Sequence, residues 1–210
     1  MKSDRKAELV AAATELIAER GYDSFSYADL SQRSGLAKPS IHHHFPTKGE
    51  LVLAVLDAVQ ASQQAQVQAC VRAYGAAAAV ELLKGFVFRS WGSQICPLAS
   101  LQSEFNVLPA AVQSRLSEVS ATEVRSLSAL LQAYATSIGK ALALPAEDAA
   151  RVVLCAAKGA LLYGRTDQSV WIDRVVAQTL ALLLNPPAIM VAAAANRRQQ
   201  ARVRRTRPAP

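Results

Sequence analysis

The chain has 210 residues, of which 51% are hydrophobic and 6% aromatic, and its formal net charge is +7. Alanine, leucine and valine therefore dominate, which favours an all-α protein with room for one large or two small domains. The sequence contains no secretory signal and no apolar stretch of about 18 residues or more. Its three cysteines are far apart and form no CxxC pair, which argues against a disulfide framework or a zinc site and favours reduced thiols in the cytoplasm.

The first predicted helix is marked by an apolar stripe. Leu9, Ala13, Leu16 and Ile17 are spaced as neighbours on one helical face, and Gly21 is placed to end the helix. A second, short helix is predicted after Gly21. It begins at a capping box and stops at Gly35.

The box is formed by Ser26, as N-cap, and Asp29. A tight turn follows at 35–38, and a third helix is predicted over 39–45, because Pro39 suits a first helical turn. Ile41 and Phe45 share the inner face of that helix.

A long amphipathic helix is predicted next. It begins at a second capping box, Thr47 with Glu50, and continues to about residue 70. Further helices are predicted near 76–90, 98–106, 109–137, 145–164 and 169–184. Residues 185–210 hold six arginines and no acid, so nearly all of the excess charge lies there, and 187–210 is predicted to be a disordered basic tail.

Three consecutive histidines stand in the third predicted helix. His42 to His44 point about 100° apart on a helix and cannot converge on one ion, so no metal site is predicted. They spread instead over the exposed arc, with Ser40. Helix, short helix, glycine turn and short helix is the layout of a helix-turn-helix, whose exposed arc fits a DNA major groove.

The residues expected to touch DNA are those of this arc, its flanking lysines and the N-terminal caps of two helices, where free N–H groups favour a phosphate. They are Ser26, Lys38, Pro39, Ser40, His42, His43, His44, Thr47 and Lys48.

The stretch "GYDSFSYADLSQRSGLAKPSIHHHFPTKGEL" (21–51) resembles the DNA-binding segment of TetR-type (tetracycline-repressor-like) regulators. The matching places are Gly21, Ser26, Asp29-Leu30, Gly35-Leu36, His42-His43-His44-Phe45 and Pro46-Thr47-Lys48. The chain departs from the family pattern in two ways. His42 and His44 stand where tyrosine is frequent, and Ala37 stands where serine or threonine usually caps the recognition helix.

The resemblance implies a three-helix DNA-binding domain over 1–50 and a larger helical domain over 51–186 that binds an effector and forms a homodimer through its last two helices. The apolar segments 149–164 and 171–184 agree with that role, and Ala156, Gly159 and Ala160 are small enough for helices to approach closely. The alternative is that these are ordinary core helices.

The segment 86–105 is the candidate effector site, because it gathers aromatic residues in a chain that has few. The candidates are Phe86, Phe88, Trp91, Cys96 and Phe105, and plain core packing is the competing interpretation. Cys96 precedes Pro97, which is predicted to open a helix. A thiol at a helix N-terminus can be reactive, so we weigh an electrophile or redox sensor against an inert buried thiol.

These patterns together predict a ligand-responsive transcriptional regulator, a repressor that a small molecule releases from its operator. The alternative is a helical small-molecule-binding protein or enzyme with no DNA role. No nucleophile elbow, phosphate loop, HExxH or paired-carboxylate motif supports catalysis, and no cofactor or membrane partner is expected. The expected partners are double-stranded operator DNA, an unknown effector and a second copy of the chain.

Overall fold

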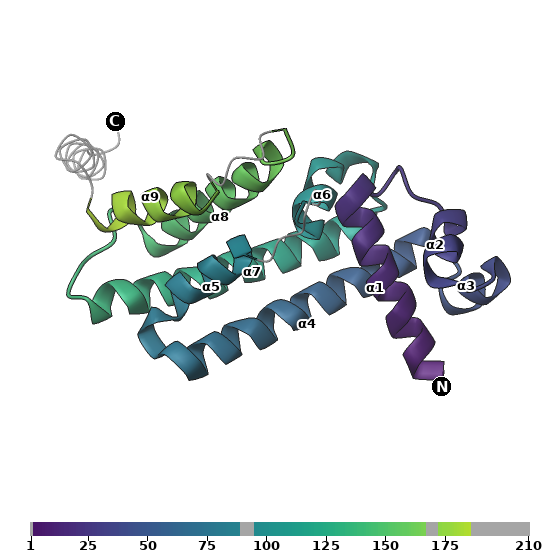
Figure 1. The fold of residues 1–210 in the computed structure, drawn as a ribbon, viewed down its shortest axis with the longest axis horizontal. Coiled ribbons are helices and arrows are strands. Elements are labelled where there is room, and N and C mark those ends of the chain that lie inside the picture. Colours follow the sequence, from purple (N-terminus) through teal and green to yellow (C-terminus); the bar gives the residue numbers. More distant parts are fainter. Residues whose placement is uncertain (1, 89–94, 167–171, 186–210) are drawn as a thin grey trace, which may run out of the picture.

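A computed structural model describes residues 2–88, 95–166 and 172–185 of the chain, and within these ranges the fold is helical (Figure 1). The helices are α1 (Lys2–Arg20), α2 (Tyr27–Ser34), α3 (Lys38–His44), α4 (Lys48–Tyr74), α5 (Ala78–Phe88), α6 (Pro97–Ser103), α7 (Ala110–Ser137), α8 (Ala146–Tyr163) and α9 (Ile172–Leu184). Short 3-10 turns, η1 (Gly75–Ala77) and η2 (Phe105–Val107), precede α5 and α7. The all-α prediction is confirmed.

The predicted apolar stripe of α1 is buried. Leu16 and Ile17 are almost fully enclosed, and they meet Leu30 of α2, Ile41 of α3 and Leu51 of α4 in one hydrophobic cluster. α2 and α3 lie at one end of the molecule, with α1 crossing the N-terminal part of α4 (Figure 1). The cluster holds α3 through its apolar side, which leaves the opposite side of the helix at the surface.

The larger part of the molecule is built on α4 and α7, two helices of 27 and 28 residues that run alongside one another. α5 and α8 flank them, and α9 packs on α8 and α5 (Figure 1). Leu83, Leu131, Val153 and Leu183 belong to a second hydrophobic cluster at this end. α9 ends at the end of the molecule opposite α2 and α3.

The first cluster does not stop at residue 50. It also contains Leu98 and Leu101 of α6 and Leu116 of α7, all nearly fully buried. The helices packed around α3 therefore share one hydrophobic core with α6. α6 lies beyond residue 50, where the sequence predicts that the DNA-binding domain ends. This shared packing is what positions the candidate site relative to the rest of the chain.

Helix boundaries differ from the sequence prediction by small amounts. The long helix predicted to end near 70 continues to Tyr74, where Gly75 adopts a positive φ of 53°. The helix expected over 39–45 begins and ends one residue earlier, because Phe45 leaves the helical conformation at φ −138°. The tail predicted over 187–210 lies outside the described residues. No helix in the described part of the chain is long and apolar enough to cross a membrane.

Candidate nucleic-acid interface

The turn between α2 and α3 is tied by side chains on both sides. Ser31 Oγ donates to the Leu36 carbonyl (2.6 Å), and Ser34 Oγ accepts from the Leu36 N–H (3.3 Å). Gly35 has φ 71°, a left-handed conformation that most residues adopt only with strain, and its N–H donates to the Ser31 carbonyl. These contacts set the angle at which α3 leaves α2.

The inner side of α3 is anchored at its C-terminal end. Ile41 and Phe45 are buried, as the sequence predicts. The phenol of Tyr27, in α2, donates to the Phe45 carbonyl (2.8 Å), which caps the end of α3. Burial, with the nearby Glu50 carboxylate, raises the pKa of Tyr27 to about 12, so the phenol keeps its proton and remains a donor. Tyr27 was not among the candidate site residues predicted from the sequence.

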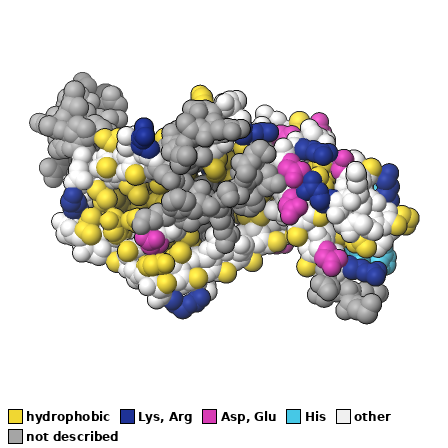
Figure 2. Space-filling view, viewed as in Figure 1, with side chains coloured by type: hydrophobic (Ala, Val, Ile, Leu, Met, Phe, Trp, Pro, Cys, Tyr) yellow, Lys and Arg dark blue, Asp and Glu magenta, His cyan; other side chains and the backbone are white. Residues whose placement is uncertain are grey.

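The outer side of α3 carries the predicted polar arc. Lys38, Pro39, His42 and His43 are exposed, while Ser40 and His44 are half-buried. The ring centroid of His42 lies 4.6 Å from that of Tyr27, and those of His43 and His44 are 5.6 Å apart. Histidine and basic side chains gather at this end of the molecule (Figure 2). The structure therefore presents hydrogen-bonding groups on one short, exposed helix face.

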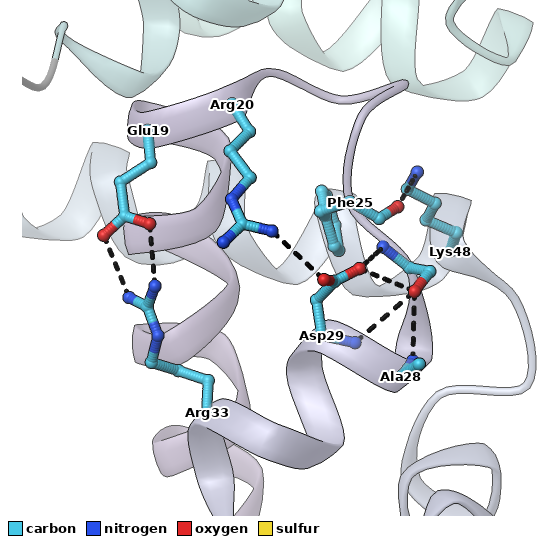
Figure 3. Close-up of polar contacts among 8 residues, drawn as sticks. Glu19, Arg20, Phe25, Ala28, Asp29, Arg33 and Lys48 are labelled. Carbon is cyan, nitrogen blue, oxygen red and sulfur yellow. Dashed lines mark hydrogen bonds and ion pairs between the residues drawn. The ribbon is translucent and has the colours of Figure 1, made fainter.

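The Ser26 hydroxyl is engaged in hydrogen bonds within the protein. Its hydroxyl accepts from the N–H groups of Ala28 (3.2 Å) and Asp29 (3.4 Å) and donates to the Asp29 carboxylate (2.6 Å), so the predicted capping box is confirmed. These hydrogen bonds, with the Arg20 guanidinium, lower the pKa of Asp29. Arg20 and Arg33 hold α1 and α2 together through Asp29 and Glu19 (Figure 3). The N-terminus of α2 already holds a carboxylate.

Thr47 is exposed, and its hydroxyl oxygen accepts from the Glu50 N–H (3.2 Å), so the Thr47 half of the second capping box is present. The hydroxyl proton stays available for another acceptor. Thr47 therefore lies at the N-terminus of α4 in the geometry that the sequence analysis expected for a phosphate contact.

Lys48 turns inward. Its ammonium donates to the Phe25 carbonyl (2.5 Å) (Figure 3). It also lies over the rings of Tyr22 (4.5 Å) and Phe25 (4.3 Å). Burial lowers the pKa of Lys48, against the opposing effect of nearby carboxylates. Such contacts stabilise a cation against aromatic faces. Lys48 thus joins α4 to the α1–α2 loop. The position of this lysine beside the histidine run in the sequence did not reveal this structural role.

Ala37 is the N-cap of α3 and offers no side-chain acceptor. Because Pro39 has no N–H, the Ser40 N–H is the one within reach of a capping hydroxyl at this position. Ala37→Ser should therefore stabilise the protein by up to about 1 kcal/mol. Thermal unfolding would show a rise of about 2–4 °C.

The control is Ala121→Ser, which places the same hydroxyl on the exposed side of α7. It should leave the melting temperature unchanged or slightly lower. A melting temperature for Ala37→Ser that matches the control would contradict a missing cap at α3.

The contacts between α1 and the segment around α6 were not predicted, because they join polar atoms about 80 residues apart in the sequence. The Glu104 carboxylate accepts from the N–H groups of Tyr22 and Asp23, and the buried Ser100 hydroxyl donates to the Ile17 carbonyl (2.8 Å). A Cβ on Gly21, which has φ 87°, would lie 2.7 Å from the Glu104 carboxylate oxygens. These contacts satisfy backbone groups at the end of α1.

The predicted effector residues are only partly described. The side chains of Phe86 and Phe88, and all of Trp91, lie outside the described residues. Phe105 is 38% exposed in η2, and Cys96 is buried in the first hydrophobic cluster. A cavity instead lies between α4, α5, α7 and α8, and neither Cys96 nor Phe105 is among the described residues that line it.

The surroundings of Cys96 favour the inert buried thiol over the reactive sensor. The residue is the N-cap of α6, but burial raises the pKa of its thiol, which outweighs the helix N-terminus and nearby Lys158. The thiolate is the reactive form. Of the three cysteines, Cys155 is exposed and Cys70 is half-buried.

Limited alkylation of the native protein should therefore modify the half-buried Cys70 before the buried Cys96. Mass spectrometry of peptides after short exposure to iodoacetamide measures the order, and the unfolded protein, in which all three thiols are exposed, serves as the control. Early labelling of Cys96 would show that the segment around α6 opens in solution.

α8 carries an apolar stripe that faces away from its own protomer. Val152, Cys155, Leu162 and Tyr163 are exposed at helical spacing, and Leu162 and Tyr163 are 54% and 68% exposed. A Cβ on Gly159, in the same stripe, would meet nothing within 4 Å. We expected Ala160 on this face. It is buried instead, because it shares the opposite side of α8 with Val153 and Ala157, which are also buried.

Two helices joined by a tied turn, with a polar outer face on the second, are a helix-turn-helix, here attached to a larger helical domain. The model described as "Bacterial regulatory proteins, tetR family" matches residues 9–55. The N-terminal segment is thus similar to the DNA-binding segment of TetR-family regulators, and the resemblance expected from the sequence is confirmed.

Three known proteins illustrate the similarity. The "HTH-type transcriptional activator FasR" of Mycolicibacterium smegmatis is 38% identical over 55 residues, 26% of this chain and 25% of that protein. The "HTH-type transcriptional repressor KstR2" of Rhodococcus jostii is 36% identical over 55 residues, 26% of this chain and 27% of that protein. The match thus spans about a quarter of the curated relatives. A TetR-family regulator from Agrobacterium tumefaciens has the same fold, with a TM-score of 0.80 at 24% identity, covering 88% of this chain and 100% of its own.

Proposed function

We propose that this protein is a transcriptional repressor that binds double-stranded operator DNA as a homodimer and is released by a small molecule. The observation that carries the proposal is the exposed arc of α3, whose opposite side is fixed by Ile41 and Phe45. The family match to residues 9–55 supports it, and no motif or site among the described residues favours the alternative without a DNA role. The function implies a cytoplasmic, non-enzymatic protein.

The proposed DNA contacts divide into two kinds. Lys38 and Thr47, at the two ends of α3, meet phosphates, while Ser40 and the three histidines reach base edges or phosphates in the major groove. Pro39, which has no polar side-chain group, contacts the DNA backbone by van der Waals packing. Ser26 and Lys48, which are engaged within the protein, contribute to the proposal by holding α2, α3 and α4 in place.

The proposed dimer forms through the exposed stripe of α8 and includes α9, on which Leu182 is exposed. Apolar side chains in a continuous exposed stripe favour association with a second apolar surface. A two-fold dimer places two copies of α3 on paired half-sites, which a single copy cannot recognise together.

Release by a small molecule requires two states of the protein with different α3 spacing. The contacts of Ser100 and Glu104 with the end of α1 supply a direct connection between the larger domain and the DNA-binding helices. A shift of α6 changes the position at which α1, and with it α3, is held. The relatives include both an activator and a repressor, so repression rather than activation is part of the proposal.

The proposal is tested by fluorescence anisotropy with labelled DNA from upstream of the protein's own coding region. We expect saturable binding that is stronger than binding to a random duplex of equal length at the same salt concentration. Equal affinity for both duplexes, in a correctly folded dimer, would contradict binding of this operator. No binding to either duplex at low salt would remove the DNA-binding function.

A further inference from the structure

The cavity between α4, α5, α7 and α8 is lined by both apolar and polar residues. Its volume is about 80 Å³. Val67, Leu83, Leu127, Leu154 and Ala157 are among its apolar residues. The polar lining residues come from one side of α4 and from α7, and they are Gln60, Gln63, Gln64, Gln66, Thr122, Glu123 and Ser126. A molecule that fills this cavity is therefore mainly apolar with hydrogen-bonding groups at one end.

Glu123 is the one charged residue among the described residues that line the cavity. Its side chain is 10% exposed, and its carboxylate accepts from Lys158 Nζ (2.6 Å) and from Gln63 Nε2 (3.4 Å). Lys158 is 13% exposed and does not line the cavity. The Glu123 carboxylate thus lines the cavity, while Lys158, whose ammonium balances its charge, lies outside the lining.

We propose that this cavity binds an uncharged, mainly apolar small molecule through a hydrogen-bond donor, such as an amide or hydroxyl, that Glu123 accepts. The inference rests on the proposed function, because it specifies the class of effector. An ionised carboxylate in the same place would meet a like charge in a poorly hydrated site, and a molecule without a donor would leave the carboxylate with poorer solvation. Charge therefore selects against anionic effectors here.

Lys158 connects this site to the DNA-binding helices. Its ammonium also lies 3.4 Å from the Gln102 amide oxygen, and Gln102 is on α6 beside Ser100 and Glu104. A donor that binds Glu123 competes with the ion pair. The cavity is also smaller than the roughly 150 Å³ apolar cavity that accepts benzene, so a ring-sized ligand displaces its walls. The first effect reaches α6 through Gln102, and the second reaches it through α7, which lines the cavity and packs against α6.

The test uses three probes of one shape. Benzamide has N–H donors, acetophenone replaces them with a methyl group, and benzoate carries a negative charge near neutral pH. Binding to the full-length protein is measured by ligand-observed NMR and by the ligand-dependent rise in melting temperature. Benzamide should bind at least about tenfold more tightly than benzoate and several-fold more tightly than acetophenone.

Two variants locate the binding. Ser126→Phe projects a ring from the cavity wall and should abolish benzamide binding, whereas Ala129→Phe, on the exposed side of α7, should not. Glu123→Gln combined with Lys158→Met removes the charge without leaving either partner unpaired, and should reduce the preference for benzamide over benzoate by several-fold. Replacing both partners guards against a loss of folding.

The proposal is overturned if benzoate binds as tightly as benzamide, if acetophenone equals benzamide, if no probe binds, or if Ser126→Phe leaves binding intact. Specific operator binding is measured on the same samples. A protein that binds its operator but none of the probes contradicts this inference and leaves the DNA-binding function in place. A protein that binds benzamide but not DNA contradicts the proposed function.

Discussion

Leu162→Glu is expected to convert the protein to a monomer and to lower operator affinity by at least about a hundredfold, because binding of two linked half-sites is lost. Leu162 is 54% exposed on the stripe of α8 and is absent from both hydrophobic core clusters, so the charge should not unfold the protomer. Buried at a two-fold interface, the two glutamates would repel one another without a partner. Sedimentation velocity and anisotropy with operator DNA measure the two effects.

The matched control is Val71→Glu, on α4, where valine is 43% exposed and lies outside the stripe. It should remain a dimer with unchanged operator affinity. If Leu162→Glu stays dimeric at the same concentration, another surface holds the two copies together.

Replacing Lys38 and His43 with alanine should weaken operator binding by about 1–3 kcal/mol for each side chain that contacts a base, and by a salt-dependent amount for a phosphate contact. Both side chains are exposed, and neither forms a hydrogen bond to the α2–α3 turn, so helical content and melting temperature should hold. Lys48 is left intact in this variant, because its ammonium supports the fold through Phe25.

The two single variants separate the roles. Lys38→Ala should flatten the dependence of log affinity on log salt by about one unit, as expected when one phosphate contact is lost. His43→Ala should reduce the preference for operator over random DNA with a smaller change in slope. Arg72→Ala, at the end of α4 and remote from α3, removes the same charge as Lys38→Ala and should change neither quantity. An unchanged affinity and slope in the double variant would remove α3 from the interface.

The helices were predictable because their signals are local. The stripe of α1, the Ser26–Asp29 box and the prolines at helix starts each act within a few residues, and the structure contains all of them. The polar arc of α3 could be predicted in the same way, because Ile41 and Phe45 determine which side of the helix is buried.

The parts that could not be predicted depend on the distance between residues in space. The sequence shows a lysine beside a histidine run, but only the fold brings Lys48 to the Phe25 carbonyl. Glu123 and Lys158 are 35 residues apart and on different helices, so no spacing rule pairs them. Cys96 illustrates the competing effects: a local rule suggested a reactive thiol at a helix start, and burial raised its pKa instead.

The larger domain is joined to the end of α1 by the shared hydrophobic core and by polar contacts to main-chain atoms of this segment. Glu104 binds the N–H groups of Tyr22 and Asp23, Ser100 binds the Ile17 carbonyl, and the Ile95 N–H donates to the Ala18 carbonyl (3.2 Å). Main-chain groups are the same in every sequence, apart from proline. Evolution, or an engineer, can therefore exchange the proposed DNA-reading segment for that of a relative if two conditions are met: the apolar side chains that pack on Leu98, Leu101 and Leu116 are kept, and a glycine remains at position 21 to leave room for the carboxylate. In terms of the proposed function, one effector-binding domain can in this way be connected to many different operators.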